Sequence, residues 1–193
     1  MSVRPRPRAL RKSRRAETVF IKSKAQVALV LAILLVQFYP VSATAATDKY
    51  LTLQKSVGYT IYKPANTLKL APLNFEVRPC RLFPKKDKYL LAGFGGMDLG
   101  IALVETSAQF NCTGIDNPKL LGTVFINGIK AKVGIYCSGA TCTAAKFASV
   151  GGEITFLAPA SKKFKATFIR IGTQGGFTQA QLIAFAKGLQ PVL

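Results

Sequence analysis

The clearest structural signal in this chain is the stretch Gly122-Thr-Val-Phe-Ile-Asn-Gly-Ile-Lys-Ala-Lys-Val-Gly-Ile135. Asn-Gly between two apolar runs is the preferred two-residue type I′ turn of a β-hairpin. A turn at Asn127-Gly128 places the aliphatic side chains on one face: Val124, Ile126, Ile129, Ala131, Val133 and Ile135. Lys130 and Lys132 then point to the opposite face. The sequence therefore predicts an antiparallel hairpin with one apolar face and one basic face.

Further apolar runs with a period of two predict more strands on both sides of this hairpin. They cover residues 59–63, 73–78, 89–94, 99–105, 152–157 and 164–171. The glycine-rich segment 95–98 predicts a turn between the third and fourth runs, and residues 106–120 predict an irregular connection. Gly93 to Gly100 resembles a phosphate-binding loop, but Asp98 occupies the position of the third glycine and a strand follows.

A helix is predicted near the C-terminus, where Thr178 and Gln181 have the spacing of a capping box. Its apolar stripe comprises Leu182, Ile183, Ala186 and Leu189. Gly188 and Pro191 predict its end. A shorter helix is predicted over residues 50–57. Together these patterns predict an α+β fold, with a twisted, mainly antiparallel sheet and the C-terminal helix packed on one face.

The first 45 of the 193 residues differ from the rest. Residues 1–24 contain nine Arg and Lys and a single acid, and Val27–Val36 is an unbroken apolar run. Ala43-Thr-Ala45 has the small-residue spacing of a signal-peptidase site. A positive start, a short apolar segment and small residues are the three parts of a secretory signal. We therefore expect a basic leader and signal peptide over 1–45, with cleavage at Ala45–Ala46.

An uncleaved membrane anchor is the alternative interpretation of this segment. The positive-inside rule would then leave residues 1–24 in the cytoplasm. A run of ten apolar residues is short for a spanning helix, which favours cleavage. In either case residues 46–193 form a single extracytoplasmic domain, and the membrane is a partner during export or as an anchor.

The four cysteines, Cys80, Cys112, Cys137 and Cys142, all follow the apolar run. An oxidising compartment favours disulfides over a four-thiolate zinc site, and the spacing is not that of a zinc knuckle. Four cysteines allow three pairings. The small residues between Cys137 and Cys142 favour a local bridge, which leaves Cys80–Cys112 and a loop of about 30 residues worth roughly 3–4 kcal/mol.

The chain contains no histidine, which excludes Ser-His-Asp and Cys-His catalysis and nearly every catalytic zinc site. Carboxylate catalysis would have to use two of the exported acids: Asp48, Glu76, Asp87, Asp98, Glu105, Asp116 and Glu153. They form no motif, and for Glu76 and Glu105 on predicted strands a solvent-facing position is the ordinary case. The sequence indicates no catalytic, cofactor-binding or metal-binding residues.

The exported part carries 18 Lys and Arg against 7 Asp and Glu. Two clusters stand out, and their members are Lys85, Lys86, Lys88, Lys162, Lys163 and Lys165. Such an excess favours anionic partners, here a cell-wall polymer or lipid headgroups. A solvated surface that promotes solubility is the other interpretation. The export signal argues against nucleic acid, and the sequence does not indicate the oligomeric state.

The last 75 residues resemble a bacterial family of extracytoplasmic domains of unknown function. The resemblance rests on four segments in order: Gly122–Gly128, Gly152–Phe156, Lys165–Ile171 and Phe177–Lys187. Domains of this family occur on lipoproteins and on anti-sigma-factor-like envelope proteins. The resemblance implies a binding or sensing module and supplies no catalytic residues.

These observations favour an exported, non-catalytic envelope protein that binds anionic material. A membrane-anchored sensor or accessory domain with a short basic cytoplasmic tail is the first alternative. A secreted hydrolase that depends on two carboxylates is the second.

Overall fold

The computed structural model describes residues 43–80, 87–96, 99–107, 112, 118–137, 139 and 141–192, and of residues 43–48 the backbone alone. Residues 42–193 form one compact unit. The helices are α2 (Ala43–Gln54), η1 (Ala144–Lys146, 3₁₀), α3 (Phe147–Val150) and α4 (Gln179–Lys187). The strands are β1 (Tyr62–Pro64), β2 (Pro72–Pro79), β3 (Lys88–Gly95), β4 (Gly100–Ser107), β5 (Lys119–Ile126), β6 (Ile129–Ile135), β7 (Gly152–Ala158), β8 (Thr167–Thr173) and β9 (Leu189–Pro191).

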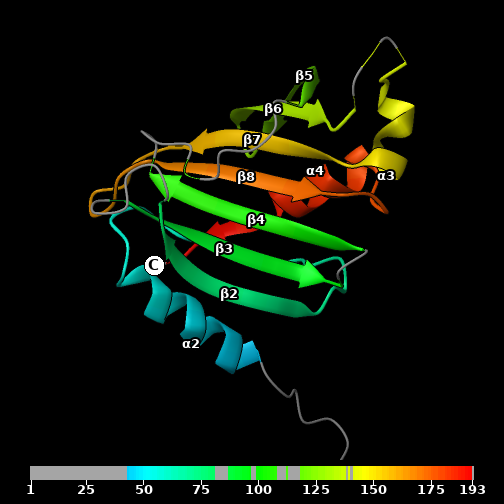
Figure 1. The fold of residues 1–193 in the computed structure, drawn as a ribbon. Helices are drawn as coiled ribbons and strands as arrows, with labels where there is room; N and C mark the ends of the chain where they lie inside the picture. The colour runs from blue at the N-terminus through cyan, green and yellow to red at the C-terminus, as the bar shows by residue number, and fades with distance from the viewer. Residues whose placement is uncertain are drawn as a thin grey trace, which may run out of the picture. The chain divides into compact units, whose positions relative to one another are not determined.

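Seven of these strands form one antiparallel sheet in the order β2-β3-β4-β8-β7-β6-β5 (Figure 1). Helix α4 lies behind this sheet in Figure 1. The α+β class, the antiparallel sheet and the packed C-terminal helix are therefore confirmed. The strand order differs from the chain order because β8 inserts between β4 and β7.

The hairpin predicted from Asn127-Gly128 forms in the expected register. Ile126 pairs with Ile129 and Val124 with Ala131 across β5 and β6. Both turn residues have positive φ, 48° and 83°, as a type I′ turn requires.

The main core lies between the inner face of the sheet and α4. Alternate strand residues, among them Ile154, Ile169 and Ile171, are fully buried against Leu182 and Phe185 of the helix. Thr178 and Gln181 form the capping box that was predicted for this helix. A capping box satisfies two backbone donors at the helix start and so fixes where α4 begins.

A second apolar cluster covers the rest of the inner face. It contains Tyr50 of α2, Tyr59 and Ile61 before β1, Leu90 of β3 and Val192 after β9. Strands β1 and β9 pair as a separate two-stranded sheet. The two ends of the domain thus meet over strands β3 and β4.

Local expectations differ from the structure at several points. The first helix spans Ala43–Gln54 rather than 50–57, because the alanines favour helix and Ser56 caps its end on the Leu53 carbonyl. Leu189 belongs to β9 and not to the α4 stripe. Strand β8 begins at Thr167, because residues 161–164 close a turn. Helices η1 and α3 were not predicted.

The leader and the Val27–Val36 run lie outside the described residues. Within the described ranges, no helix has the length and apolarity needed to cross a bilayer. Ala45 and Ala46 fall in α2, and cleavage beside them stays a prediction.

Candidate functional site

The predicted anion-contact lysines that the structure describes lie at one end of the sheet. Lys88 begins β3. The next residue, Tyr89, pairs with Thr106 near the end of β4, and Thr106 in turn pairs with Phe168 near the start of β8. The connection from β7 to β8 at this same end carries Lys162, Lys163 and Lys165, all exposed. Lys85 and Lys86 lie outside the described residues.

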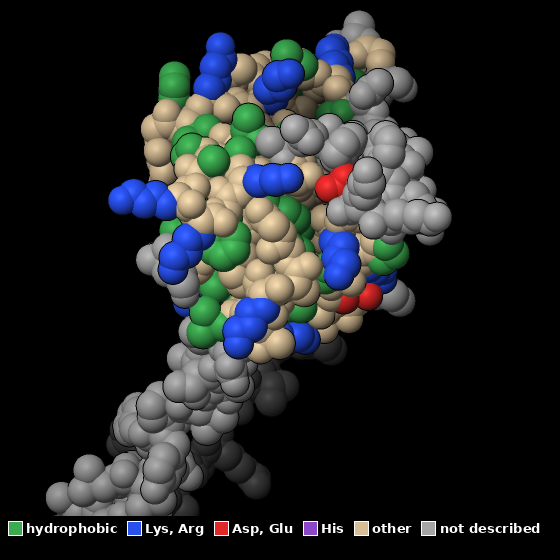
Figure 2. All heavy atoms as spheres, turned by 90° about the vertical axis from the view of Figure 1, so that its left-hand side faces the viewer, with side chains coloured by type: hydrophobic (Ala, Val, Ile, Leu, Met, Phe, Trp, Pro, Cys, Tyr) green, Lys and Arg blue, Asp and Glu red, His purple; other side chains and the backbone are tan. Residues whose placement is uncertain are grey.

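A fifth lysine joins this end from the C-terminus of α4. The Asn127 amide in the β5–β6 turn donates to the Lys187 carbonyl oxygen at 3.0 Å. We define the basic end as the exposed lysines Lys88, Lys162, Lys163, Lys165 and Lys187. Figure 2 looks onto this end and shows many basic side chains around it and few acidic ones.

No acid neutralises these lysines in the described part of the chain. The ion pairs found there join Glu76 to Arg78 and Glu153 to Arg170. Asp87, the described acid nearest in sequence, lies 3.4 Å from the Ser107 hydroxyl, which donates to it. The basic end therefore carries an excess of positive charge, although Asp87 lies beside Lys88.

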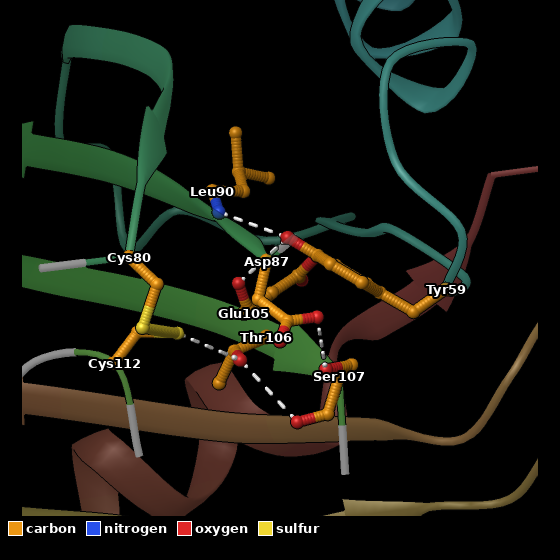
Figure 3. Close-up of a disulfide and its surroundings, with 8 residues drawn as sticks. All are labelled: Tyr59, Cys80, Asp87, Leu90, Glu105, Thr106, Ser107 and Cys112. Atoms are coloured by element: carbon orange, nitrogen blue, oxygen red, sulfur yellow. Dashed lines mark hydrogen bonds between the residues drawn. A yellow bond between two sulfur atoms is a disulfide. The ribbon is translucent and has the colours of Figure 1, made fainter. Parts of the chain in front are cut away.

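A disulfide lies among the strand ends near Asp87 (Figure 3). Cys80 after β2 is bonded to Cys112, and the Cys80 N–H donates to the Asp87 carbonyl oxygen at 2.8 Å. The Thr106 hydroxyl lies 3.5 Å from the Cys112 sulfur. The bridge thus holds the β2–β3 connection against the end of β4.

The second disulfide joins Cys137 to Cys142. Both bridges follow the pairing that the spacing favoured, and their formation leaves none of the four thiols free to bind zinc. Two disulfides are consistent with an oxidising, extracytoplasmic compartment. Among the described residues, no group of three or more acidic or sulfur ligands gathers to hold a metal.

Two acids are buried, and for one of them, Glu105, the solvent-facing position expected from the sequence is wrong. Glu105 is fully buried and Glu153 is 6% exposed, so neither is an ordinary surface residue. Both acids pair with residues of β8: Glu105 with Ile169, and Glu153 with Gly172. These two β8 residues are three positions apart. Because side chains alternate along a strand, the two carboxyls lie on opposite faces of the sheet. They do not converge on one cleft as a glycosidase pair would.

Glu105 is enclosed under β1 on the inner face. Both of its carboxyl oxygens lie 3.0 Å from the Tyr62 N–H, which donates to them. Burial raises the pKa of this carboxyl well above its usual range, against the opposing effect of the Tyr62 N–H. The alternation Ile101, Leu103, Glu105 was the signal in the sequence, because it places the acid on the face of two core residues.

Glu153 forms a buried polar cluster with Arg170 and Tyr136 on the outer face. The Arg170 guanidinium pairs with the Glu153 carboxylate, and the Tyr136 hydroxyl donates to the same carboxylate at 2.8 Å. Burial raises the pKa of Tyr136 above its ordinary value, and the Glu153 charge adds to this shift. Within this cluster the positive charge of Arg170 offsets the negative charge of Glu153.

Comparison with known proteins returned no match: no family model, no curated protein and no solved structure resembles this chain significantly. What the molecule shows by itself is an α+β domain with two disulfides and a basic end. The resemblance of its last 75 residues to extracytoplasmic domains of unknown function stays a prediction.

Proposed function

We propose that this protein is exported and acts as a non-catalytic module that binds anionic material of the cell envelope through its basic end. The observation that carries the proposal is the position of five exposed lysines, from three separate segments of the chain, at one end of the sheet, with no described acid paired to any of them. An array of unpaired charges attracts polyanions, and its effect depends on ionic strength.

The framework beneath the basic end supports this proposal. The Cys80–Cys112 bridge and the Asn127 contact to Lys187 hold the surrounding segments in place. A pre-organised surface loses less conformational freedom on binding than a mobile one. Lysine suits this role, since it recognises phosphate as a compact point charge without demanding a fixed geometry.

Vesicle co-sedimentation tests the proposal. The residue 46–193 protein should bind vesicles that contain phosphatidylglycerol, fail to bind phosphatidylcholine vesicles, and lose most binding between about 0.05 and 0.3 M salt. A poly(glycerol phosphate) competitor distinguishes the two sources of phosphate: if it binds more tightly than the vesicles, the target is the wall polymer.

A matched pair of variants locates the surface. Lys162→Glu/Lys163→Glu removes charge from the basic end, whereas Lys69→Glu/Lys146→Glu makes the same change in net charge near the opposite strand ends. We expect the first variant to lose binding and the second to retain it. Equal loss in both would show that net charge alone acts, and binding unchanged by salt would refute the proposal.

A further inference from the structure

The two edges of the seven-stranded sheet are built differently. Strand β2 has a proline at each end, a register shift after Pro72, and the charged pair Glu76 and Arg78 within it. Prolines, charges and bulges are the devices that prevent an edge strand from pairing with another chain. One edge of the sheet is therefore protected.

Strand β5, at the other edge, has little of this protection. Its eight residues, Lys-Leu-Leu-Gly-Thr-Val-Phe-Ile, include no proline and no acid, and a register shift occurs only near its start, between Leu120 and Gly122. It pairs with β6 on one side, and among the described residues no strand pairs with its other side. Leu120 is 58% exposed and Phe125 67% exposed. A long, apolar, unpaired edge is a template for an added strand.

The two faces of β5 define what such a strand would meet. On the inner face Val124 lies opposite Ala131. Val124 and Ile183 of α4 are both partly buried and pack at the margin of the core. On the outer face Thr123 lies opposite Lys132 and Phe125 opposite Lys130. Apolar side chains of an added strand would extend the core on the inner face.

The charge on the outer face favours acidic residues on the side of an added strand that faces it. On this face β6 carries Lys130 and Lys132, and neither β5 nor β6 contains an acid. The nearest acid on this face, Glu153 of β7, is already paired with Arg170. An added strand would lie about 10 Å from β6, and the long lysine stems can reach across Thr123 toward it.

We propose that the free edge of β5 accepts an extended segment of another protein, in which apolar and acidic residues alternate, as an eighth strand of the sheet. The apolar residues would pack beside Val124 on the inner face, and the carboxylates would lie toward Lys130 and Lys132 on the outer face. This mode of recognition uses backbone hydrogen bonds for affinity and alternate side chains for specificity. A second copy of this chain fits less well, because both partners would bring the same lysines and a large positive charge.

The test uses the residue 46–193 protein and fluorescein-labelled ten-residue peptides at 0.15 M salt. One peptide alternates valine and glutamate, a second alternates valine and lysine, and a third repeats the first with alternate backbone nitrogens methylated. We expect fluorescence anisotropy to detect binding of the first peptide alone. Amide signals of β5 should shift in NMR spectra on its addition, because the new backbone hydrogen bonds form there.

Two variants with equal changes in charge separate this surface from the basic end. Lys130→Glu/Lys132→Glu should weaken binding of the valine–glutamate peptide by about tenfold or more, and Lys162→Glu/Lys163→Glu should leave it within about twofold. Absence of binding, equal binding of the methylated peptide, or equal loss in both variants would overturn the proposal. A stable dimer in light scattering, with β5 amides protected from exchange, would assign the edge to a second copy instead. Failure here leaves the vesicle experiment unaffected.

Discussion

The N–H of Tyr62 lies 3.0 Å from each carboxyl oxygen of Glu105, and this contact ties β1 to the middle of the main sheet. The acid is fully buried and the strand above it belongs to the separate β1–β9 pair. The contact therefore connects the covering segments at both ends of the domain to a titratable group beneath them.

Glu105 makes the stability of the domain depend on pH. Burial raises the pKa of its carboxyl in the folded state, so the folded protein holds this proton more tightly than the unfolded chain does. The stabilising contribution is complete below the unfolded pKa of about 4.5 and is lost as the pH rises through the folded pKa. We expect Glu105→Gln to remove this loss, because the amide carries no charge.

Urea unfolding at pH 4, 6 and 8 measures the effect. The difference in the free energy of unfolding between Glu105→Gln and the wild type should grow with pH, by up to about 1.4 kcal/mol per unit. Glu76→Gln is the control, since Glu76 lies on an edge strand. Parallel curves for the wild type and Glu105→Gln would contradict this account.

The Tyr59 hydroxyl joins two strands beneath the same covering segment. It donates to the Glu105 carbonyl oxygen at 2.8 Å and accepts from the Leu90 N–H at 3.0 Å. Tyr59→Phe removes both of these buried hydrogen bonds, which should lower the free energy of unfolding by about 1–3 kcal/mol.

Tyr50→Phe is the matched control for this change. The Tyr50 hydroxyl is also buried, and it has no hydrogen-bond partner among the described residues. Its removal should leave stability unchanged or raise it, because an unpaired polar group is costly to bury. Chemical denaturation of both variants decides the matter, and equal destabilisation would argue against the role assigned to Tyr59.

The two disulfides should contribute unequally. The Cys80–Cys112 bridge spans 32 residues and the Cys137–Cys142 bridge 5. In the chain-entropy account, removing the bridge that closes the longer loop lowers the free energy of unfolding by roughly 3–4 kcal/mol. Removing the bridge that closes the shorter loop lowers it by about 2 kcal/mol. Denaturation of the two double alanine variants tests this order, and the reverse order would show that native contacts outweigh loop closure.

Local signals predicted the parts of this fold that depend on neighbouring residues. The Asn127-Gly128 turn fixed the register of one hairpin, and Thr178 and Gln181 fixed the start of α4. The insertion of β8 between β4 and β7 depends on pairing between distant segments, for which a single sequence carries no comparable signal. Leu189 was misassigned for the same reason, since its pairing with Pro64 spans most of the domain.

The candidate sites also combine features that the sequence shows with features that depend on the strand order. Lysine clusters were visible in the sequence, but their convergence with Lys187 required the strand order. The unprotected edge at β5 could not be recognised before it was known which strands lie at the edges. Glu153 and Arg170 are 17 residues apart and meet only because β7 and β8 are neighbours.

That last pair supports a prediction about the outer face. The Glu153 and Arg170 side chains are 8% and 7% exposed, so removing one leaves a buried charge without its partner. Arg170→Met should lower the free energy of unfolding by roughly 3–5 kcal/mol. Glu153→Gln/Arg170→Met should recover much of this loss, since the amide keeps an acceptor for the Tyr136 hydroxyl and carries no charge. A double-mutant cycle measures the coupling, and additive effects would show that the two charges do not depend on one another.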